Sequence, residues 1–144
     1  MAEAIFRNVV SQRLGCSEDH LARNGFDILS AGVAAGENFP ASRDAVELLR
    51  DRGIDLSEHL SRQVTSELLS ECDRVYAMTQ SHLAVLEEAR PDLSGRMHLV
   101  AVNGRDVSDP IGGGPDVYRQ CADELTEAIS KIADELVRKD DAAT

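Results

Sequence analysis

The feature that most limits what this chain can fold into is a long apolar stripe near its C-terminus. Eleven apolar side chains recur there at intervals of three and four residues, which places them along one face of a single helix. They are Val117, Tyr118, Cys121, Ala122, Leu125, Ala128, Ile129, Ile132, Ala133, Leu136 and Val137. Such a face must pack against a core formed by the rest of the chain. With 144 residues, 42% of them hydrophobic, we expect one domain over residues 1–139 and a disordered tail over residues 140–144.

Upstream of the stripe, short apolar runs alternate with helical stretches. Residues 26–32, 74–78 and 97–102 have the composition of strands. Helical patterns are found in residues 1–10, after Ser42, around Leu68 and in residues 81–89. Strands that alternate with helices of about ten or more residues imply parallel connections. The sequence therefore predicts an α/β fold with three layers, in which helices cover both faces of an open parallel sheet.

Charge and cysteine content exclude several classes of function. There are 26 acidic and 15 basic residues, and the resulting net charge of −11 would repel nucleic acid and anionic membranes. No run approaches the ~20 apolar residues of a membrane span, and there is no apolar signal region, so we expect a soluble cytoplasmic protein. The three cysteines, Cys16, Cys72 and Cys121, lie far apart without a Cys-x-x-Cys or Cys/His cluster. This spacing argues against a disulfide framework and against a metal site.

One loop stands out as a functional candidate. Asp109 is followed by Pro110, which disfavours the helical conformation at Asp109, and then by three glycines that allow close approach to a ligand. In parallel sheets, ligands bind outside the carboxyl ends of the strands, so the turns after Ala31, Met78 and Val102 should share one rim. Asp109 is expected on this rim. The alternative is a plain surface turn.

Six blocks of sequence carry a resemblance to a known family. The blocks are Met-Ala-Glu-Ala-Ile-Phe-Arg at 1–7, Ser-Ala-Gly at 30–32, Gly-Ile-Asp-Leu-Ser-Glu-His at 53–59, Arg-Gln-Val-Thr at 62–65, Met-Thr-Gln-Ser-His at 78–82 and Asp-Pro-Ile-Gly-Gly at 109–113. In this order they resemble low-molecular-weight protein-tyrosine phosphatases of the bacterial type, close to protein-arginine phosphatases. The likeness covers nearly the whole chain.

The resemblance implies a phosphoryl transfer in two steps, without metal or cofactor. In the family, a Cys-x5-Arg-Ser-Pro loop binds phosphate and its cysteine thiolate attacks phosphorus. An aspartate in the Asp-Pro loop protonates the leaving oxygen, and the resemblance assigns this role to Asp109. Ser30 and His59 match positions that form a hydrogen-bonded network bracing the phosphate loop. The expected partner is a phosphorylated protein or a small phosphomonoester, and the oligomeric state stays open.

The sequence departs from the family at the nucleophile. The phosphate loop would precede Met1, together with the family's first strand in the centre of the sheet. No cysteine here can replace it, because the residues six positions after Cys16, Cys72 and Cys121 are Ala22, Met78 and Glu127. We therefore expect a truncated domain without activity of its own and with inert thiols. A misplaced start site, a fragment of a longer gene and a degenerate paralogue are the three explanations.

Substrate choice stays open between phosphotyrosine, the family default, and phosphoarginine. Ile111 follows Asp-Pro, and it can pack on an aliphatic or aromatic group but cannot stack as an aromatic residue would. Arsenate reductases of the same fold need a further cysteine pair after Met78, and residues 79–90 contain none. The alternative of another class is a pseudophosphatase or interaction module that binds a partner at the glycine-rich rim.

Overall fold

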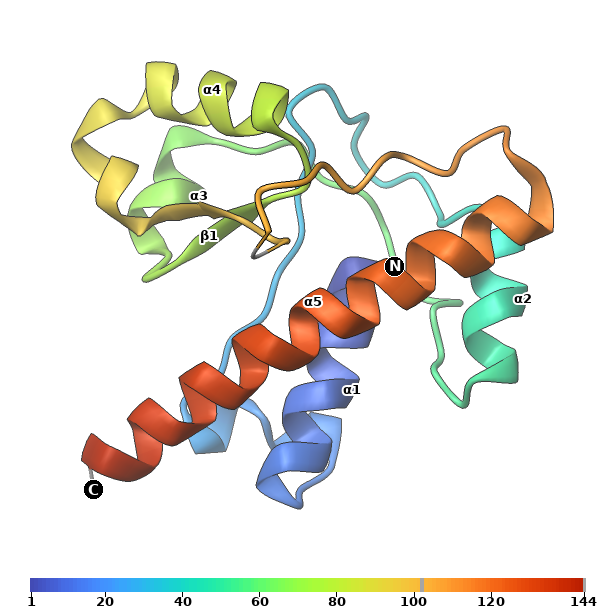
Figure 1. Ribbon diagram of the computed structural model, residues 1–144, viewed down its shortest axis with the longest axis horizontal. Helices are drawn as coiled ribbons and strands as arrows, with labels where there is room; N and C mark the ends of the chain where they lie inside the picture. Colours follow the sequence, from blue (N-terminus) through green and yellow to red (C-terminus); the bar gives the residue numbers. More distant parts are fainter. Residues whose placement is uncertain (102, 144) are drawn as a thin grey trace.

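Helices surround a small parallel sheet in this chain (Figure 1). The computed structural model describes residues 1–101 and 103–143. Its α-helices are α1 (Ala2–Leu14), α2 (Arg43–Asp51), α3 (Ser66–Glu71), α4 (Gln80–Ala89) and α5 (Gly114–Ala143). Its strands are β1 (Val75–Ala77) and β2 (Met97–Leu99), and short 3-10 turns occur at η1 (Glu18–His20), η2 (Ala22–Asn24) and η3 (Pro91–Arg96).

The sheet separates two hydrophobic cores. Strands β1 and β2 pair in parallel, with Tyr76 opposite His98. Tyr76 packs against the core built by α1, α2 and α5, whereas its neighbour Ala77 belongs to the core beneath α3 and α4. This alternation is what a strand requires, because successive side chains point to opposite faces. The predicted α/β class, with helices flanking a parallel sheet, is thereby confirmed.

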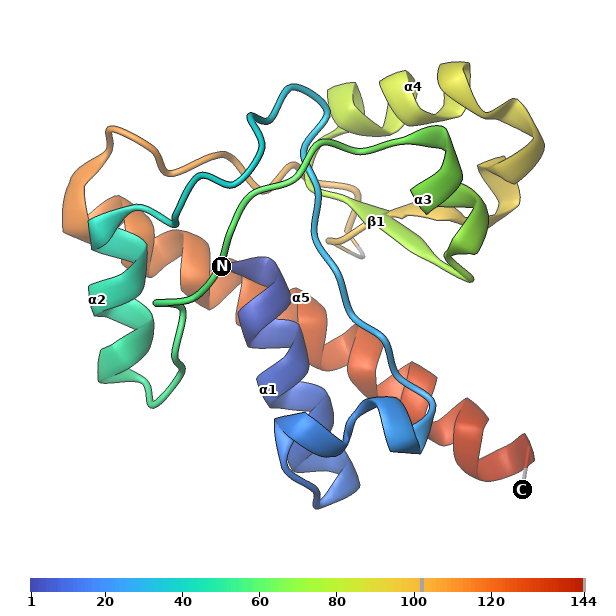
Figure 2. The same cartoon turned by 180° about the vertical axis from the view of Figure 1, so that it is seen from behind.

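The strand predicted for residues 26–32 is not formed. Only Gly32 makes a bridge, in which its N–H donates to the Arg62 carbonyl at 2.9 Å and its carbonyl accepts from Val64. Elsewhere the extended segment is held by side chains of α1, since Arg7 donates to the Ile28 carbonyl at 3.3 Å. Figure 2 shows this segment passing alongside α1. The prediction was wrong because composition cannot show which partner takes the backbone hydrogen bonds.

The long C-terminal helix is confirmed as α5, and α1 packs along it. Ile5 and Val10 of α1 and Ala122 and Ile129 of α5 are almost completely buried in their shared core. Helix α2 packs on the same core and begins at Ser42, whose Oγ accepts from the Ala45 N–H at 3.3 Å. These three helices build the larger core of the molecule.

Helix α5 continues to Ala143, so it includes residues 140–143, for which we expected a disordered tail. Arg138, Lys139, Ala142 and Ala143 have high helix propensity and can extend this end of the helix beyond the core. Two positions of the expected elements, Val102 at the end of a strand and Thr144 in the tail, lie outside the described residues.

Replacement of Ile129 by alanine should lower the free energy of unfolding by about 2–5 kcal/mol, because it leaves a cavity where α1 meets α5. Ile129 is 1% exposed, whereas Ile111 is 73% exposed, so Ile111→Ala is the matched control with little expected effect. Urea unfolding followed by circular dichroism measures both values. Similar losses for the two variants would contradict this description of the core.

Candidate functional site

Asp109 is exposed on the loop between β2 and α5. Its Oδ1 accepts a hydrogen bond from the Ile111 N–H at 3.0 Å, which forms a local turn. The turn closes with the Gly113 N–H donating to the Pro110 carbonyl at 2.9 Å. A Cβ on Gly113 would lie 2.7 Å from the Val117 side chain, so glycine is required where the turn meets α5. The loop thus presents a carboxylate to solvent on a tightly packed base.

The loop is attached to the carboxyl end of β1. The Val107 N–H donates to the carbonyl of Met78, the residue that follows β1, at 2.8 Å. On the other side, the Cys121 thiol of α5 donates to the Ser108 carbonyl at 3.7 Å. These contacts place Asp109, two residues after Val107, near the strand end where the sequence predicted the rim.

The N-terminus of α1 lies close to the same region. Burial raises the pKa of the Cys121 thiol, as do the charges of Glu124 and Asp109, while the Met1 amino group lowers it. Burial in turn lowers the pKa of the Met1 amino group, against the effect of Cys121 and Glu3. Cys121 is therefore near both Asp109 and the start of α1. Among the residues that the structure describes, no side chain caps α1, and a helix N-terminus with free N–H groups favours an anion.

The carboxylate of Glu3 contacts both other predicted site residues, Ser30 and His59. Its Oε1 accepts from the Ser30 N–H at 2.8 Å and from the Ser30 hydroxyl at 3.4 Å. Its Oε2 lies 3.5 Å from Nδ1 of His59. The side chains of Glu3 and His59 are 19% and 22% exposed, so this network is largely protected from water. The structure thus brings Ser30 and His59 to one carboxylate in the first turn of α1.

Sequence reasoning missed Glu3 as a site residue. A signal was available, because Glu3 is the one charged residue among Ala2, Ala4, Ile5 and Phe6 in the first turns of a helix that packs on the core. A carboxylate in such a position is costly to bury unless it has partners, so it predicts a hydrogen-bonded network. The identity of the partners, 27 and 56 residues away in sequence, depends on the fold.

Two of the cysteines, Cys72 and Cys121, lie in environments that suit inert thiols. Burial raises the pKa of Cys72, and nearby Asp73 and Glu71 act in the same direction. The Cys72 thiol donates to the Leu68 carbonyl at 3.2 Å. Because the thiolate is the reactive form, a raised pKa reduces the reactivity of Cys72 and Cys121 at neutral pH.

The described part of the chain contains neither a cluster of metal ligands nor a helix that could span a membrane. Within residues 1–101 and 103–143, no three His, Cys, Asp or Glu side chains are grouped as metal ligands. Over the same residues, no helix has both the length and the apolar character needed to cross a bilayer.

Known proteins resemble the chain over nearly its full length. The family described as low molecular weight phosphotyrosine protein phosphatase matches residues 1–142. A protein-arginine-phosphatase of Bacillus subtilis is 35% identical over 140 residues, which are 94% of this chain and 87% of that protein. A low molecular weight protein tyrosine phosphatase from T. tengcongensis has a TM-score of 0.80 at 35% identity, covering 93% of this chain and 88% of that one. The YwlE arginine phosphatase from Geobacillus stearothermophilus has a TM-score of 0.79 at 30% identity. The match covers 96% of this chain and 84% of that one.

Fold and sequence together place the chain among the phosphatases, a class of hydrolases. It belongs to the low molecular weight phosphotyrosine protein phosphatase family.

Replacement of Glu3 by alanine should release Ser30, because its N–H loses a charged acceptor in a largely protected position. We expect faster amide hydrogen exchange at Ser30 and a loss of about 1–3 kcal/mol in the free energy of unfolding. Glu58→Ala, at an exposed position beside His59, is the control. Unchanged exchange at Ser30 in the Glu3 variant would show that Glu3 does not hold this segment.

Proposed function

We propose that this chain supplies the proton donor of a phosphomonoester hydrolase that works through a cysteinyl-phosphate, with Asp109 as the general acid. The observation that carries the proposal is that Asp109 is exposed on a loop attached to the carboxyl end of β1 and follows Ser108, whose carbonyl contacts Cys121 of α5, the helix on which α1 packs. An anion at the start of a helix is stabilised by free N–H groups and the helix dipole. A carboxylic acid positioned there typically contributes 10²–10⁴ in rate.

The proposed reaction has two steps. A thiolate attacks phosphorus and forms the sulfur–phosphorus bond while the bond to the leaving oxygen breaks, and Asp109 gives its proton to that oxygen. Water then attacks the cysteinyl-phosphate, Asp109 takes a proton from the water, and phosphate and thiolate are released. In this scheme Glu3, Ser30 and His59 brace the start of α1, where the phosphate would lie.

No cysteine of this chain fits the role of the nucleophile. None of Cys16, Cys72 and Cys121 has an arginine six positions later, and burial raises the pKa of Cys72 and Cys121. We therefore propose that the thiolate loop, and the central strand that leads into it in the family, lie outside these 144 residues. The 144-residue polypeptide alone should not turn over a phosphomonoester.

Phosphotyrosine is the first candidate substrate, since the chain belongs to the low molecular weight phosphotyrosine protein phosphatase family. Phosphoarginine is the second candidate, and it is supported by the relative from Bacillus subtilis, 35% identical, which is a protein-arginine-phosphatase. Ile111, 73% exposed in the loop, offers an aliphatic surface that can pack on the side chain of either substrate. In either case Asp109 protonates the leaving atom.

The test compares the 144-residue chain with an extended chain, which carries a strand and a Cys-x5-Arg-Ser-Pro loop of the family before Met1. We expect hydrolysis of para-nitrophenyl phosphate only by the extended chain. In it, Asp109→Asn should lower kcat on a phosphotyrosine peptide by roughly 10²–10⁴, because the leaving phenolate needs a proton. Asp116→Asn, at an exposed carboxylate in the first turn of α5, is the matched control with unchanged kcat.

Turnover by the 144-residue chain itself would refute the assignment of the nucleophile. An active extended chain that is insensitive to Asp109→Asn would refute the assignment of the acid. A correctly folded extended chain without any activity would favour the pseudophosphatase, which binds a partner without hydrolysis. Parallel assays with phosphoarginine peptides decide between the two substrate classes.

A further inference from the structure

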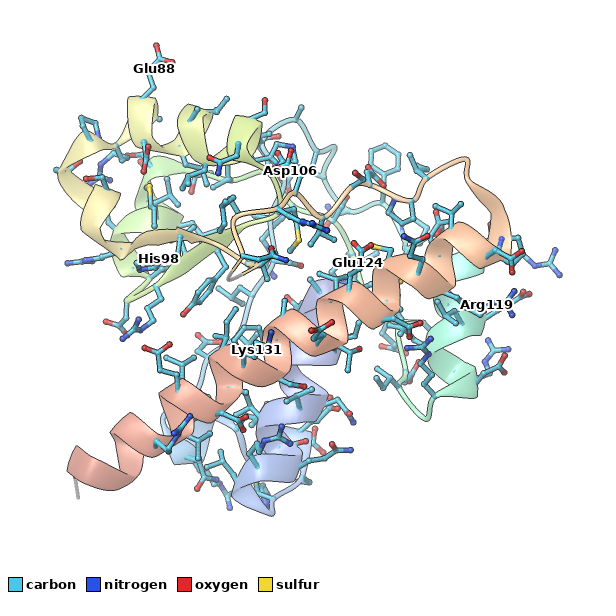
Figure 3. The ribbon with its side chains drawn as sticks, in the orientation of Figure 1. Glu88, His98, Asp106, Arg119, Glu124 and Lys131 are labelled. Atoms are coloured by element: carbon cyan, nitrogen blue, oxygen red, sulfur yellow. The ribbon has the colours of Figure 1, made fainter. Side chains whose placement is uncertain are left out.

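Asp106 connects the loop that carries Asp109 to helix α4. Its Oδ1 accepts a hydrogen bond from the Gln80 N–H at 2.8 Å, and Gln80 is the first residue of α4. Figure 3 shows Asp106 beside this end of the helix. A carboxylate at a helix N-terminus is favoured by the free N–H groups and by the helix dipole. The side chain therefore ties the loop to a separate, packed element.

The next residue makes a second attachment. Val107 is buried, with 5% exposure, and its N–H donates to the Met78 carbonyl at 2.8 Å. Consecutive residues of the loop thus bind the start of α4 and the end of β1, which fixes both the position and the direction of the chain. Asp109 follows two residues later, within about 8 Å, since consecutive Cα atoms are 3.8 Å apart.

Asp109 depends on this base for its own position. Its carboxylate is exposed and accepts a hydrogen bond from Ile111, a residue of the same loop. Such a bond moves with the loop and does not anchor it. The location of the carboxylate in the molecule is therefore set by the backbone that Asp106 and Val107 hold, together with the contact of the Ser108 carbonyl with Cys121 of α5.

Capping of α4 alone does not account for the contact. Thr79 already provides a side-chain cap, because its Oγ1 accepts from the His82 N–H at 3.1 Å. Asp106 belongs to a loop 26 residues away in sequence from Gln80. Its carboxylate accepts the N–H of Gln80, the residue next to Thr79. The two side chains thus act on the same helix end, but only Asp106 belongs to the loop.

We propose that Asp106 is a positioning residue for Asp109: by accepting the Gln80 N–H it holds the base of the loop, and this keeps the Asp109 carboxylate directed at the leaving group. The proposal rests on the proposed function, in which Asp109 is the general acid. Asp106 itself takes no part in bond breaking.

The first test uses the 144-residue chain and NMR measurement of amide exchange with solvent. Asp106→Ala should speed exchange of the Ile111 and Gly113 N–H groups roughly tenfold, because the turn opens more often once its base is released. Asp106→Asn keeps an oxygen acceptor and should restore slow exchange. Thr79→Ala weakens the same helix end without touching the loop, and it should leave both rates within about twofold of the parent.

The second test measures activity in the extended chain. Asp106→Ala should lower kcat on a phosphotyrosine peptide more than on para-nitrophenyl phosphate, whose leaving group departs with little help from an acid, and KM should change little. It should have no further effect when Asp109→Asn is already present. Unchanged loop exchange in Asp106→Ala, or equal effects of Asp106→Ala and Thr79→Ala on the loop, would overturn the proposal. If the extended chain is inactive, the proposed function fails while the exchange test still decides the role of Asp106.

Discussion

The packing of α1 along α5 is the interaction on which the rest of the structure depends. Side chains such as Ile5 and Ile129 are almost completely buried between the two helices, and each contributes about 1.5–3 kcal/mol by leaving water. The same packing brings the first turn of α1 to Cys121, close to the loop that carries Asp109. The arrangement of the candidate site is thus a consequence of how one helix pair fits together.

The carboxylates of Glu3, Asp106 and Asp109 differ in their hydrogen bonds and in their exposure. Glu3 accepts from Ser30 and lies beside His59, and Asp106 accepts from the start of α4, so both are engaged by neighbouring donors. Asp109 remains exposed. This division matters in a chain of net charge −11, which repels an anionic substrate at long range. Under the proposed function, phosphate would therefore be bound by local donors, and the N–H groups at the start of α1 are suited to this.

Local patterns in the sequence predicted the elements whose partners are close in the chain. The stripe of α5, the cap at Ser42 and the exposed loop at Asp109 all follow from spacing or turn chemistry, and the structure contains each of them. Residues 26–32 have the composition of a strand, yet two of their backbone groups bond to side chains of α1, and Gly32 alone forms a bridge to another extended segment. The hydrogen bonds of Glu3 and Asp106 were likewise missed, since their acceptor oxygens meet donors that only the tertiary fold brings near. The sequence specifies local conformation well and long-range hydrogen-bond partners poorly.

If Asp109 is the proton donor, its carboxylate must face the phosphate held at the start of α1. A crystal structure of the extended chain with vanadate on its thiolate shows whether it does, because vanadate imitates phosphorus during transfer. We expect a carboxylate oxygen of Asp109 about 2.6–3.2 Å from the apical oxygen of vanadate, within reach of proton transfer. An Asp109 side chain turned away from vanadate, with another group at the apical oxygen, would rule out Asp109 as the proton donor.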